Sequence, residues 1–512
     1  MIRVSFLSLI LTLAFFIVSC DRSSSVTEIT NVIVIVGDDH AANAVGCYGN
    51  EIIRTPNIDR LASSGIRFEN AYSNAPVCSA SRQSILTGKY PHATGVTLLT
   101  TPFPDEGNIT IAEYLRDRGY ETGVVGKTHF NNRTHPLPDH GFGSSMSHSG
   151  YRDWLLQQDM EPIPDSISVL PKWRPFRDSA RIWLNADVLP SAVRQEYGSA
   201  AFDAMKAIEF LENNRDTNFF LWVGFHEPHS PFNFPLEYAG RYDPADMPLP
   251  EGSPEDDRFV PEIFRGLSEA DKRGIIASYY TSVEYLDHYV GEILDAVDEL
   301  GLDENTLVVY MGDQGYLLGD HKRFEKHTMW DPAIKAPLIF RVGNKKTKKQ
   351  KNDALVQFID VVPTILDILD QPPMPDVQGK SMRYLLETRN ARGNDYVFAE
   401  FLEDNKAMVT DGKYKYVYTT GKYDLGQGYA TGEGPSGVLH KLYDLQNDPG
   451  ETVNLAEVPG YETIMESLQA EMIAIFMDTH PAAGEWVDTL STGQKLDFFC
   501  EPPDEGAKRG VE

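Results

Sequence analysis

The sequence has few cysteines, no excess of positive charge and only one long apolar run. Its four cysteines in 512 residues are Cys20, Cys47, Cys78 and Cys500. They form no closely spaced group, so neither a disulfide framework nor a cysteine-rich zinc site is predicted. The 46 lysines and arginines are outnumbered by 75 aspartates and glutamates, which gives a formal net charge of -29. This charge argues against general binding of nucleic acid or of anionic lipid headgroups.

The overall composition is that of a folded protein. Hydrophobic residues make up 41% and charged residues 24% of the chain, with 40 glycines and 32 prolines. These values argue against a disordered, collagen-like or coiled-coil protein. The length is several times that of a usual domain, so we expect one large domain and a smaller one.

The apolar run lies at the N-terminus, within residues 1–20. It follows Arg3 and ends in Val18-Ser19-Cys20, which is typical of a secretory signal rather than a spanning helix because the run is short and ends in small residues. The ending resembles a bacterial lipoprotein processing box, which would make Cys20 the lipidated first residue, with residues 21–30 as a tether. The alternative is an ordinary cleaved signal. Either way we expect an exported protein of the bacterial periplasm or cell surface that meets the membrane only through this anchor.

From Asn31 onward, short apolar strands alternate with helical patterns. Such alternation predicts an α/β fold with a large, mostly parallel sheet sandwiched by helices. The predicted strands are Val32–Val36, Thr122–Val125, Phe219–Phe225, Leu307–Met311 and Leu338–Arg341. The predicted helices are Asn57–Ser64, Ile109–Arg118, Ala200–Asn213, Ile275–Leu300 and Val361–Leu369.

The residue pattern changes after about residue 385. Alternation such as Lys413–Tyr418, followed by an amphipathic stretch at Ile464–Met477, predicts a smaller antiparallel sheet with a helix. We therefore divide the mature chain into a catalytic α/β domain at 31–385 and a C-terminal α+β subdomain at 386–512. The basic run Lys345–Lys351 contains no aromatic residue and is interpreted as a solvated loop.

Acidic residues follow two of the buried strands. Asp38 and Asp39 come after the first, and Asp313 with Gln314 after Leu307–Met311. The carboxyl ends of parallel strands are where ligands gather, and adjacent buried carboxylates repel each other unless a cation lies between them. Oxygen ligands suit Ca2+ or Mg2+ better than zinc. The alternative is that both clusters only form turns.

Cys78 lies just ahead of a predicted helix start, in Pro76–Lys89. Backbone N–H groups at a helix start would hold an anion beside this side chain, and Arg82 adds a planar pair of donors. From the residues alone, Cys78 could equally be a thiolate nucleophile or a buried structural cysteine. The segment Cys78-Ser79-Ala80-Ser81-Arg82, followed by Leu86-Thr87-Gly88, resembles the signature of type I sulfatases.

Two further segments strengthen this resemblance. Gly119–His129 is similar to the second family signature, with Thr128 in place of the usual aromatic residue, and Leu442–Leu455 is similar to the closing motif. The similarity spans about residues 31–455, with the motifs in the family's order. It implies an alkaline-phosphatase-like fold and sulfate monoester hydrolysis. It also implies that a formylglycine-generating enzyme converts Cys78 to formylglycine, whose hydrated aldehyde is the nucleophile.

The resemblance also implies a set of site residues. The ligands of one Ca2+ ion, with Mg2+ less favoured, fall on Asp38, Asp39, the modified Cys78, Asp313 and Gln314. The sulfate-binding and proton-transfer positions fall on Arg82, Lys127, His129, His229 and Lys326. The cations would balance charge on the sulfate oxygens. His229, alone or together with Lys326, would protonate the leaving oxygen, and His129 would act as base when sulfate is released.

The expected substrate is a sulfated carbohydrate. Export favours glycans at a cell surface, and the motifs look most like bacterial sulfatases of glycosaminoglycan breakdown, including those for glucosamine 6-sulfate. The stretch 151–183 is rich in aromatics and arginines, including Arg174 and Arg177, and either recognises the glycan or is an insertion packed by its own aromatics. Two alternative functions remain: a phosphonate or phosphodiester hydrolase of the same superfamily, and a non-catalytic surface glycan-binding protein.

Overall fold

A computed structural model describes most of the chain. It covers residues 28–104, 106–131, 140–146, 148–175, 177–344, 351–388, 391–421 and 437–504. The predicted signal and anchor segment with Cys20, most of the tether and most of the basic run at 345–351 lie outside these residues. Within them, no helix combines the length and apolar character needed to cross a membrane.

The larger sheet of the described chain has eight strands in the order β4-β3-β5-β1-β6-β7-β2-β8. Neighbouring strands are parallel except at β7, which is antiparallel to both β6 and β2. The prediction of a mostly parallel sheet is therefore confirmed. The strands are β1 Asn31–Gly37, β2 Ile66–Tyr72, β3 Glu121–Gly126, β4 Ser144–Met146, β5 Phe219–Gly224, β6 Thr306–Gly312, β7 Leu338–Val342 and β8 Lys351–Gln357.

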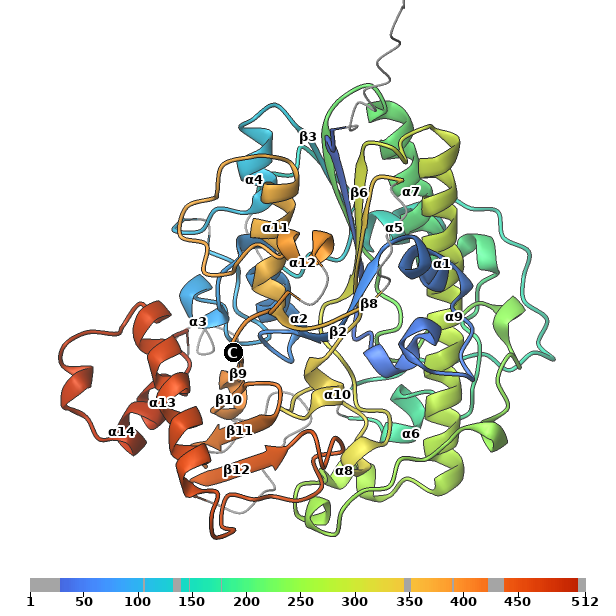
Figure 1. Ribbon diagram of the computed structural model, residues 1–512. Coiled ribbons are helices and arrows are strands. Elements are labelled where there is room, and N and C mark those ends of the chain that lie inside the picture. Colours follow the sequence, from blue (N-terminus) through green and yellow to red (C-terminus); the bar gives the residue numbers. More distant parts are fainter. Residues whose placement is uncertain are drawn as a thin grey trace, which may run out of the picture.

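The central strand β1 explains why the sheet is covered on both faces. Its run of β-branched residues is buried throughout, and alternate side chains point to opposite faces. Val32, Val34 and Val36 join one core cluster, whereas Ile33 and Ile35 join another. In Figure 1 the sheet lies between two helical layers. One contains α2 Cys78–Thr87, α4 Ile111–Arg116 and α11 Val361–Ile368, and the other α1 Pro56–Ser64, α7 Ser199–Asn214 and α9 Glu269–Glu299.

A second, smaller sheet lies beside the first (Figure 1). Its strands β9 Val397–Phe401, β10 Lys406–Thr410, β11 Tyr414–Thr419 and β12 Leu439–Asp444 are antiparallel neighbours, and α13 Glu462–Thr479 packs against them. This confirms the expected antiparallel sheet with a helix. The remaining helices are α3 Pro91–Thr94, α5 His148–Leu155, α6 Ala180–Trp183, α8 Glu262–Arg265, α10 Asp331–Ile334, α12 Arg383–Glu387 and α14 Thr492–Phe499.

Strand register brings four chain segments to one edge of the larger sheet. Gly37 at the end of β1 pairs with Gly312 at the end of β6, and Gly126 at the end of β3 pairs with Gly224 at the end of β5. The residues that follow these strands therefore emerge side by side, although they are far apart in the sequence. This is the edge at which ligands of parallel sheets bind.

Some local expectations differ from the structure. Cys78 is the first residue of α2 rather than a residue ahead of the helix. The strands β2, β4 and β8 were not predicted from the sequence, and Lys351 of the basic run begins β8 instead of lying in a loop.

A buried histidine pair between α3 and the end of α13 predicts a pH effect on stability. His480 stacks on His92 with ring centroids 5.2 Å apart. Burial, helped by His92, lowers the pKa of His480 from 6.5 to about 4. Because the folded pKa is below the unfolded one, this stabilisation is fully present above pH 6.5 and is lost as the pH falls toward 4. It amounts to at most about 3 kcal/mol.

We therefore expect His480→Phe to lose less stability than the unchanged protein between pH 7 and pH 4.5, as measured by urea unfolding. His288→Gln is the control, because the side chain of His288 is 43% exposed. If His480→Phe and His288→Gln lose the same amount of stability between pH 7 and pH 4.5, the prediction is contradicted.

Candidate active site

Cys78 opens α2 at the centre of the site. All ten residues of this helix are buried, and the residue before it, Val77, makes no side-chain cap to its first turn. Ser81 and Arg82, one turn into the helix, both bind Asp313: Ser81 Oγ donates to its carbonyl oxygen, and Arg82 Nε donates to Oδ2 at 2.8 Å. The helix start is thus fixed against the end of β6.

The acidic residues predicted at the strand ends come together. Asp38 and Asp39 follow β1, and Asp313 follows β6. Their carboxylates offer oxygens that all lie within 4.8 Å of one another. The backbone N–H of Asp39 donates to Asp313 Oδ1 at 2.9 Å, and Gln314 Nε2 donates to Asp39 Oδ1 at 2.5 Å.

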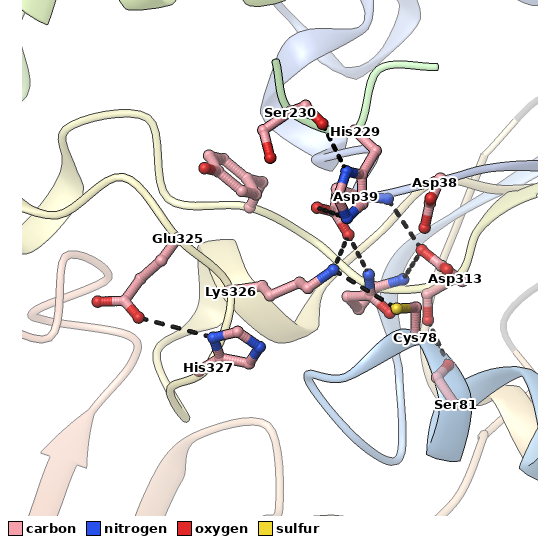
Figure 2. A network of polar contacts seen from close by, with 12 residues as sticks. Asp38, Asp39, Cys78, Ser81, His229, Ser230, Asp313, Glu325, Lys326 and His327 are labelled. Carbon is pink, nitrogen blue, oxygen red and sulfur yellow. Dashed lines mark hydrogen bonds and ion pairs between the residues drawn. The ribbon is translucent and has the colours of Figure 1, made fainter. Parts of the chain in front are cut away.

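The expected cations pair with these carboxylates, and Figure 2 shows the contact made by Lys326. Lys326 Nζ lies 2.5 Å from Asp39 Oδ1 and 3.7 Å from Cys78 Sγ, so its side chain links the nucleophile candidate to the acidic cluster. Lys127 Nζ contacts Asp38 Oδ2, and Arg82 Nη2 lies 3.4 Å from Asp38 Oδ1. Each of the three carboxylates therefore has a cationic partner.

A glycine at the end of β5 permits this close packing. A β-carbon on Gly224 would lie 2.2 Å from the carbonyl oxygen of Lys127 and 3.0 Å from Arg82 Nη1. Arg82 Nη1 donates to that same carbonyl at 2.7 Å. Any larger residue at position 224 would displace both cationic residues.

The charges set the protonation of the site. Burial opposes ionisation of Asp38, but Lys127, His229 and Arg82 outweigh it and hold the pKa of Asp38 well below its ordinary value. Burial likewise disfavours the Cys78 thiolate, yet Lys127 and Lys326 lower its pKa. Burial raises the pKa of Asp313 well above its ordinary value, despite Arg82. A buried group of this kind, between charged partners, is typical of a functional site.

The donor set fits a hard divalent cation. Oxygens on one Ca2+ lie at 2.3–2.6 Å from the ion, so a cluster spread over at most about 5 Å can share it. Asp38 Oδ1 and Gln314 Oε1 are buried and have no hydrogen-bond partner among the described residues. A bound cation would satisfy both oxygens, and Asp38, Asp39, Asp313 and Gln314 are the residues that would hold it.

The two predicted histidines have different contacts. His229 Nε2 lies 3.7 Å from Asp39 Oδ2, and its Nδ1–H donates to the carbonyl of Ser230 at 2.8 Å. His129 has a positive φ of 60°, and its carbonyl accepts from Gln83 Nε2 at 3.0 Å. Burial and Lys127 lower the pKa of His129 well below its ordinary value, so its imidazole is neutral at pH 7.

Other residues at the site were missed by the sequence analysis. His226 offers a ring nitrogen that lies, with atoms of Asp38 and His229, in a second group within 4.8 Å. His226 could have been predicted from the sequence, because it lies just after the strand β5 at the ligand-binding edge of the sheet. Tyr279 of α9 donates to the carbonyl of Asp39 and accepts from the N–H of Ala41. Nothing in the sequence links α9 to this loop, 240 residues away.

The smaller sheet is tied to the segment that carries Lys326. Lys415 of β11 is fully buried and pairs with Asp331 at 2.6 Å and Glu451 at 2.5 Å. Glu451 Oε2 also accepts from the N–H of Asp331 at 2.6 Å, at the start of α10. This network fixes the chain five residues after Lys326 and so positions the lysine.

Replacing Lys415 by methionine leaves the two carboxylates buried without their shared cation. We expect Lys415→Met to lower the free energy of unfolding by about 3–5 kcal/mol, as measured by denaturant titration. Lys335→Met is the control, because Lys335 pairs with the same Asp331 at 2.8 Å from a side chain that is 23% exposed. If Lys415→Met lowers the free energy of unfolding no more than Lys335→Met does, the network around Lys415 does not stabilise the smaller sheet against α10.

The insertion at 151–183 contributes to the site through aromatics more than through arginines. Arg174 is exposed and pairs with Asp178, and Arg181 pairs with Asp187 and Asp271. Trp183 belongs to a buried core cluster, and Trp154 packs on Phe202. Phe176 lies outside the described residues. Tyr151 and Trp173, by contrast, line a pocket that includes His229.

Comparison with known proteins gives a consistent result. A family model described as Sulfatase matches residues 30–371, and one described as N-sulphoglucosamine sulphohydrolase, C-terminal, matches residues 319–478. The chain is 29% identical over 479 residues to the arylsulfatase of Clostridium perfringens, covering 86% of this chain and 93% of that protein. It is 24% identical over 526 residues to the N-acetylglucosamine-6-O-sulfatase of Bacteroides thetaiotaomicron, covering 90% and 89%.

Solved structures share the fold. The phosphonate monoester hydrolase of Agrobacterium radiobacter superposes with a TM-score of 0.73 at 21% identity, covering 88% of this chain and 96% of that one. At this identity the likeness concerns the arrangement of helices and strands, which agrees with the predicted fold class.

Proposed function

Because the chain belongs to the sulfatase family and is a sulfuric ester hydrolase, we propose that it removes sulfate from a glycan or glycosaminoglycan fragment, with residue 78 as nucleophile. The observation that carries this proposal is the position of Cys78 at the start of α2, 3.7 Å from Lys326 and beside the acidic cluster. The activity named for the Bacteroides relative supports a glucosamine 6-sulfate as the substrate. Export, with lipidation at Cys20, would place the enzyme where such glycans occur.

Two groups complete the proposed chemistry. As formylglycine, made by a formylglycine-generating enzyme, residue 78 would supply a hydrated aldehyde whose hydroxyl attacks sulfur. A calcium ion held by Asp38, Asp39, Asp313 and Gln314 would supply positive charge at the sulfate oxygens.

The chain's own cations hold the sulfate group. Lys326 lies 3.7 Å from Cys78 Sγ, Lys127 pairs with Asp38, and Arg82 is fully buried against Asp38 and Asp313. Negative charge on the ester oxygens increases while the S–O bond breaks, so fixed cations stabilise the transition state more than the substrate. The net charge of -29 makes this local positive group necessary for an anionic substrate to bind.

The histidines handle the protons. With Nδ1–H bound to the Ser230 carbonyl, His229 presents Nε2 toward the cluster and donates its proton to the leaving sugar oxygen. Neutral His129 accepts a proton from the side chain of residue 78 when sulfate is released. The low pKa of His129, due to burial and Lys127, keeps it available as a base at neutral pH.

The proposal is tested on the tryptic peptide from Phe68 to Arg82, taken from protein purified from its native host. We expect a mass in which the sulfur of Cys78 is replaced by the oxygen of an aldehyde or its hydrate, together with turnover of sulfated sugars. An unmodified thiol in a protein that still hydrolyses sulfate esters would overturn the assigned nucleophile.

The likeness to phosphonate monoester hydrolase supports one alternative activity, on phosphonates or phosphodiesters. Both activities would use the same cluster and the same nucleophile. Parallel assays on a sulfate monoester and a phosphodiester separate them. We expect a higher kcat/KM for the sulfate monoester, and the reverse order would favour the alternative.

A further inference from the structure

The base proposed for sulfate release lies on an irregular segment. Residues 127–131 follow β3 and belong to no helix or strand. Gly126, His129 and Asn131 have positive φ angles of 78°, 60° and 57°. A residue other than glycine keeps this disfavoured conformation only where the surrounding structure holds it. The position of His129 therefore depends on contacts with other parts of the chain.

The imidazole of His129 is not fixed by a hydrogen bond to its inner nitrogen. Its Nδ1 is buried and has no hydrogen-bond partner among the described residues. A histidine that transfers protons often has one ring nitrogen bound to a carbonyl or a carboxylate, as His229 has through Ser230. Without such a bond, the direction of the His129 ring follows the direction of its backbone.

Two neighbouring side chains of α2 hold this backbone. Arg82 Nη1 donates to the carbonyl of Lys127 at 2.7 Å. Gln83 Nε2 donates to the next two carbonyls, those of Thr128 at 3.2 Å and His129 at 3.0 Å. Three consecutive carbonyls thus accept hydrogen bonds from the helix that carries the nucleophile.

The side chain of Gln83 is suited to this contact. It is fully buried, and its Oε1 has no hydrogen-bond partner among the described residues. Reversing the amide would set its oxygen against two carbonyl oxygens, so only the orientation with Nε2 toward residues 128 and 129 forms these bonds. The far end of the segment is held separately, because Asn131 Nδ2 donates to the carbonyl of Leu99 at 2.8 Å. Loss of the Gln83 contacts would therefore free His129 without releasing the whole segment.

We propose that Gln83 is a positioning residue for sulfate release, which holds the backbone of His129 so that its imidazole faces the side chain of residue 78. The inference rests on the proposed function, because it takes His129 to be the base. In that step a proton passes from the free hydroxyl of residue 78 to His129, and the hydroxyl oxygen becomes the aldehyde oxygen. Sulfate leaves with the electron pair of the bond between its bridging oxygen and carbon. Gln83 has no part in the earlier cleavage of the ester.

The two steps are separated with 4-nitrophenyl sulfate, whose cleavage releases coloured nitrophenol before sulfate leaves. Gln83→Met removes the two donated bonds, because methionine has no hydrogen-bond donor. We expect this variant to keep the first release of nitrophenol within about 3-fold of the unchanged enzyme and to lower steady-state sulfate release about 10- to 100-fold. The intact protein should then accumulate with one SO3 group on residue 78.

Ser84→Ala is the matched control, because Ser84 is the next residue of α2 and its buried Oγ has no hydrogen-bond partner among the described residues. It should leave both rates within about 2-fold. Gln83→Asn keeps an amide but withdraws its nitrogen by one methylene, so it replaces Gln83→Met with the same expected results if the latter does not fold.

Two further measurements distinguish positioning from a general structural role. In His129→Ala protein, adding Gln83→Met should change sulfate release by less than about 2-fold, because Gln83 acts through His129. In Cys78→Ala protein, adding Gln83→Met should make hydrogen exchange in residues 127–131 at least about 10-fold faster and leave exchange in β6 unchanged.

An equal lowering of nitrophenol and sulfate release, additive effects in the double variant, or unchanged exchange in residues 127–131 overturns the role of Gln83. The proposed function then still stands, provided that the unchanged protein releases sulfate. If the unchanged protein releases no sulfate from 4-nitrophenyl sulfate or from sulfated sugars, both the role of Gln83 and the proposed function are overturned.

Discussion

Cys78→Ala lowers the turnover of a sulfated sugar by at least about 1,000-fold. The side chain is 1% exposed, opens α2 and lies 3.7 Å from Lys326 Nζ. No other described residue both opens α2 and lies this close to Lys326. Loss of the attacking group removes a chemical step that substrate binding alone cannot replace. Turnover is measured as sulfate release. The acidic cluster and its cations remain, so we expect the variant to bind the substrate.

Cys47→Ala is the matched control, because Cys47 is a second free cysteine, only partly buried and hydrogen-bonded to Asp59 through its backbone. It should leave turnover within 2-fold. Cys78→Ser should show at most a single turnover, since serine can accept sulfate but has no second hydroxyl with which to expel it. If the unchanged protein binds sulfated glycan without turnover, and Cys78→Ala binds it equally well, the chain would be a glycan-binding protein.

Because we propose a bound calcium ion, we expect a calcium chelator to lower activity by at least about 100-fold and to leave the protein folded. The expected loss follows because the charge of the proposed metal ion at the sulfate oxygens would be worth several kcal/mol in the transition state. The fold persists because each carboxylate of the cluster already has a partner: Asp38 contacts Lys127, Asp39 contacts Lys326 and Asp313 contacts Arg82. Activity and thermal unfolding are measured on the same samples.

Calcium at 100 times its Kd should restore activity and raise the free energy of unfolding by about 2.7 kcal/mol. Magnesium at the same concentration should restore less, because it demands a stricter octahedral geometry. Restoration by zinc alone would instead point to the group of Asp38, His226 and His229, whose imidazoles suit that metal. Full activity in the presence of chelator would show that the cluster works through its lysines and arginine without a metal.

The acidic residues at the strand ends can be predicted from the sequence, because their positions depend on the local residue pattern. Asp38 follows a continuous buried run of β-branched residues, and Asp313 follows another, so both fall at the carboxyl edge of a parallel sheet. The register that pairs Gly37 with Gly312 then brings them together. Lys326 has no such local pattern and was placed only through the family resemblance.

The strands β2 and β8 were not predicted from the sequence for a physical reason. The strand β2 reads Ile-Arg-Phe-Glu-Asn-Ala-Tyr and β8 reads Lys-Asn-Asp-Ala-Leu-Val-Gln, and polar residues in both obscure the strand pattern. They form because β2 pairs with both β7 and β8. The pocket beside His229 is likewise lined by Tyr151, Trp173 and a loop about 60–80 residues later, a combination that periodicity does not encode.

The ion pairs of Lys415 with Asp331 and Glu451 also have a consequence for the synthesis of the chain. Asp331 meets its partners across 84 and 120 residues of sequence. During synthesis, the segment carrying Lys326 therefore leaves the ribosome long before the residues that fix it. A chain that ends between residues 388 and 415 would retain every proposed catalytic residue but lack the contacts that hold Asp331, five residues after Lys326. We therefore expect products that end before Glu451 to hydrolyse sulfate esters less well than the full chain.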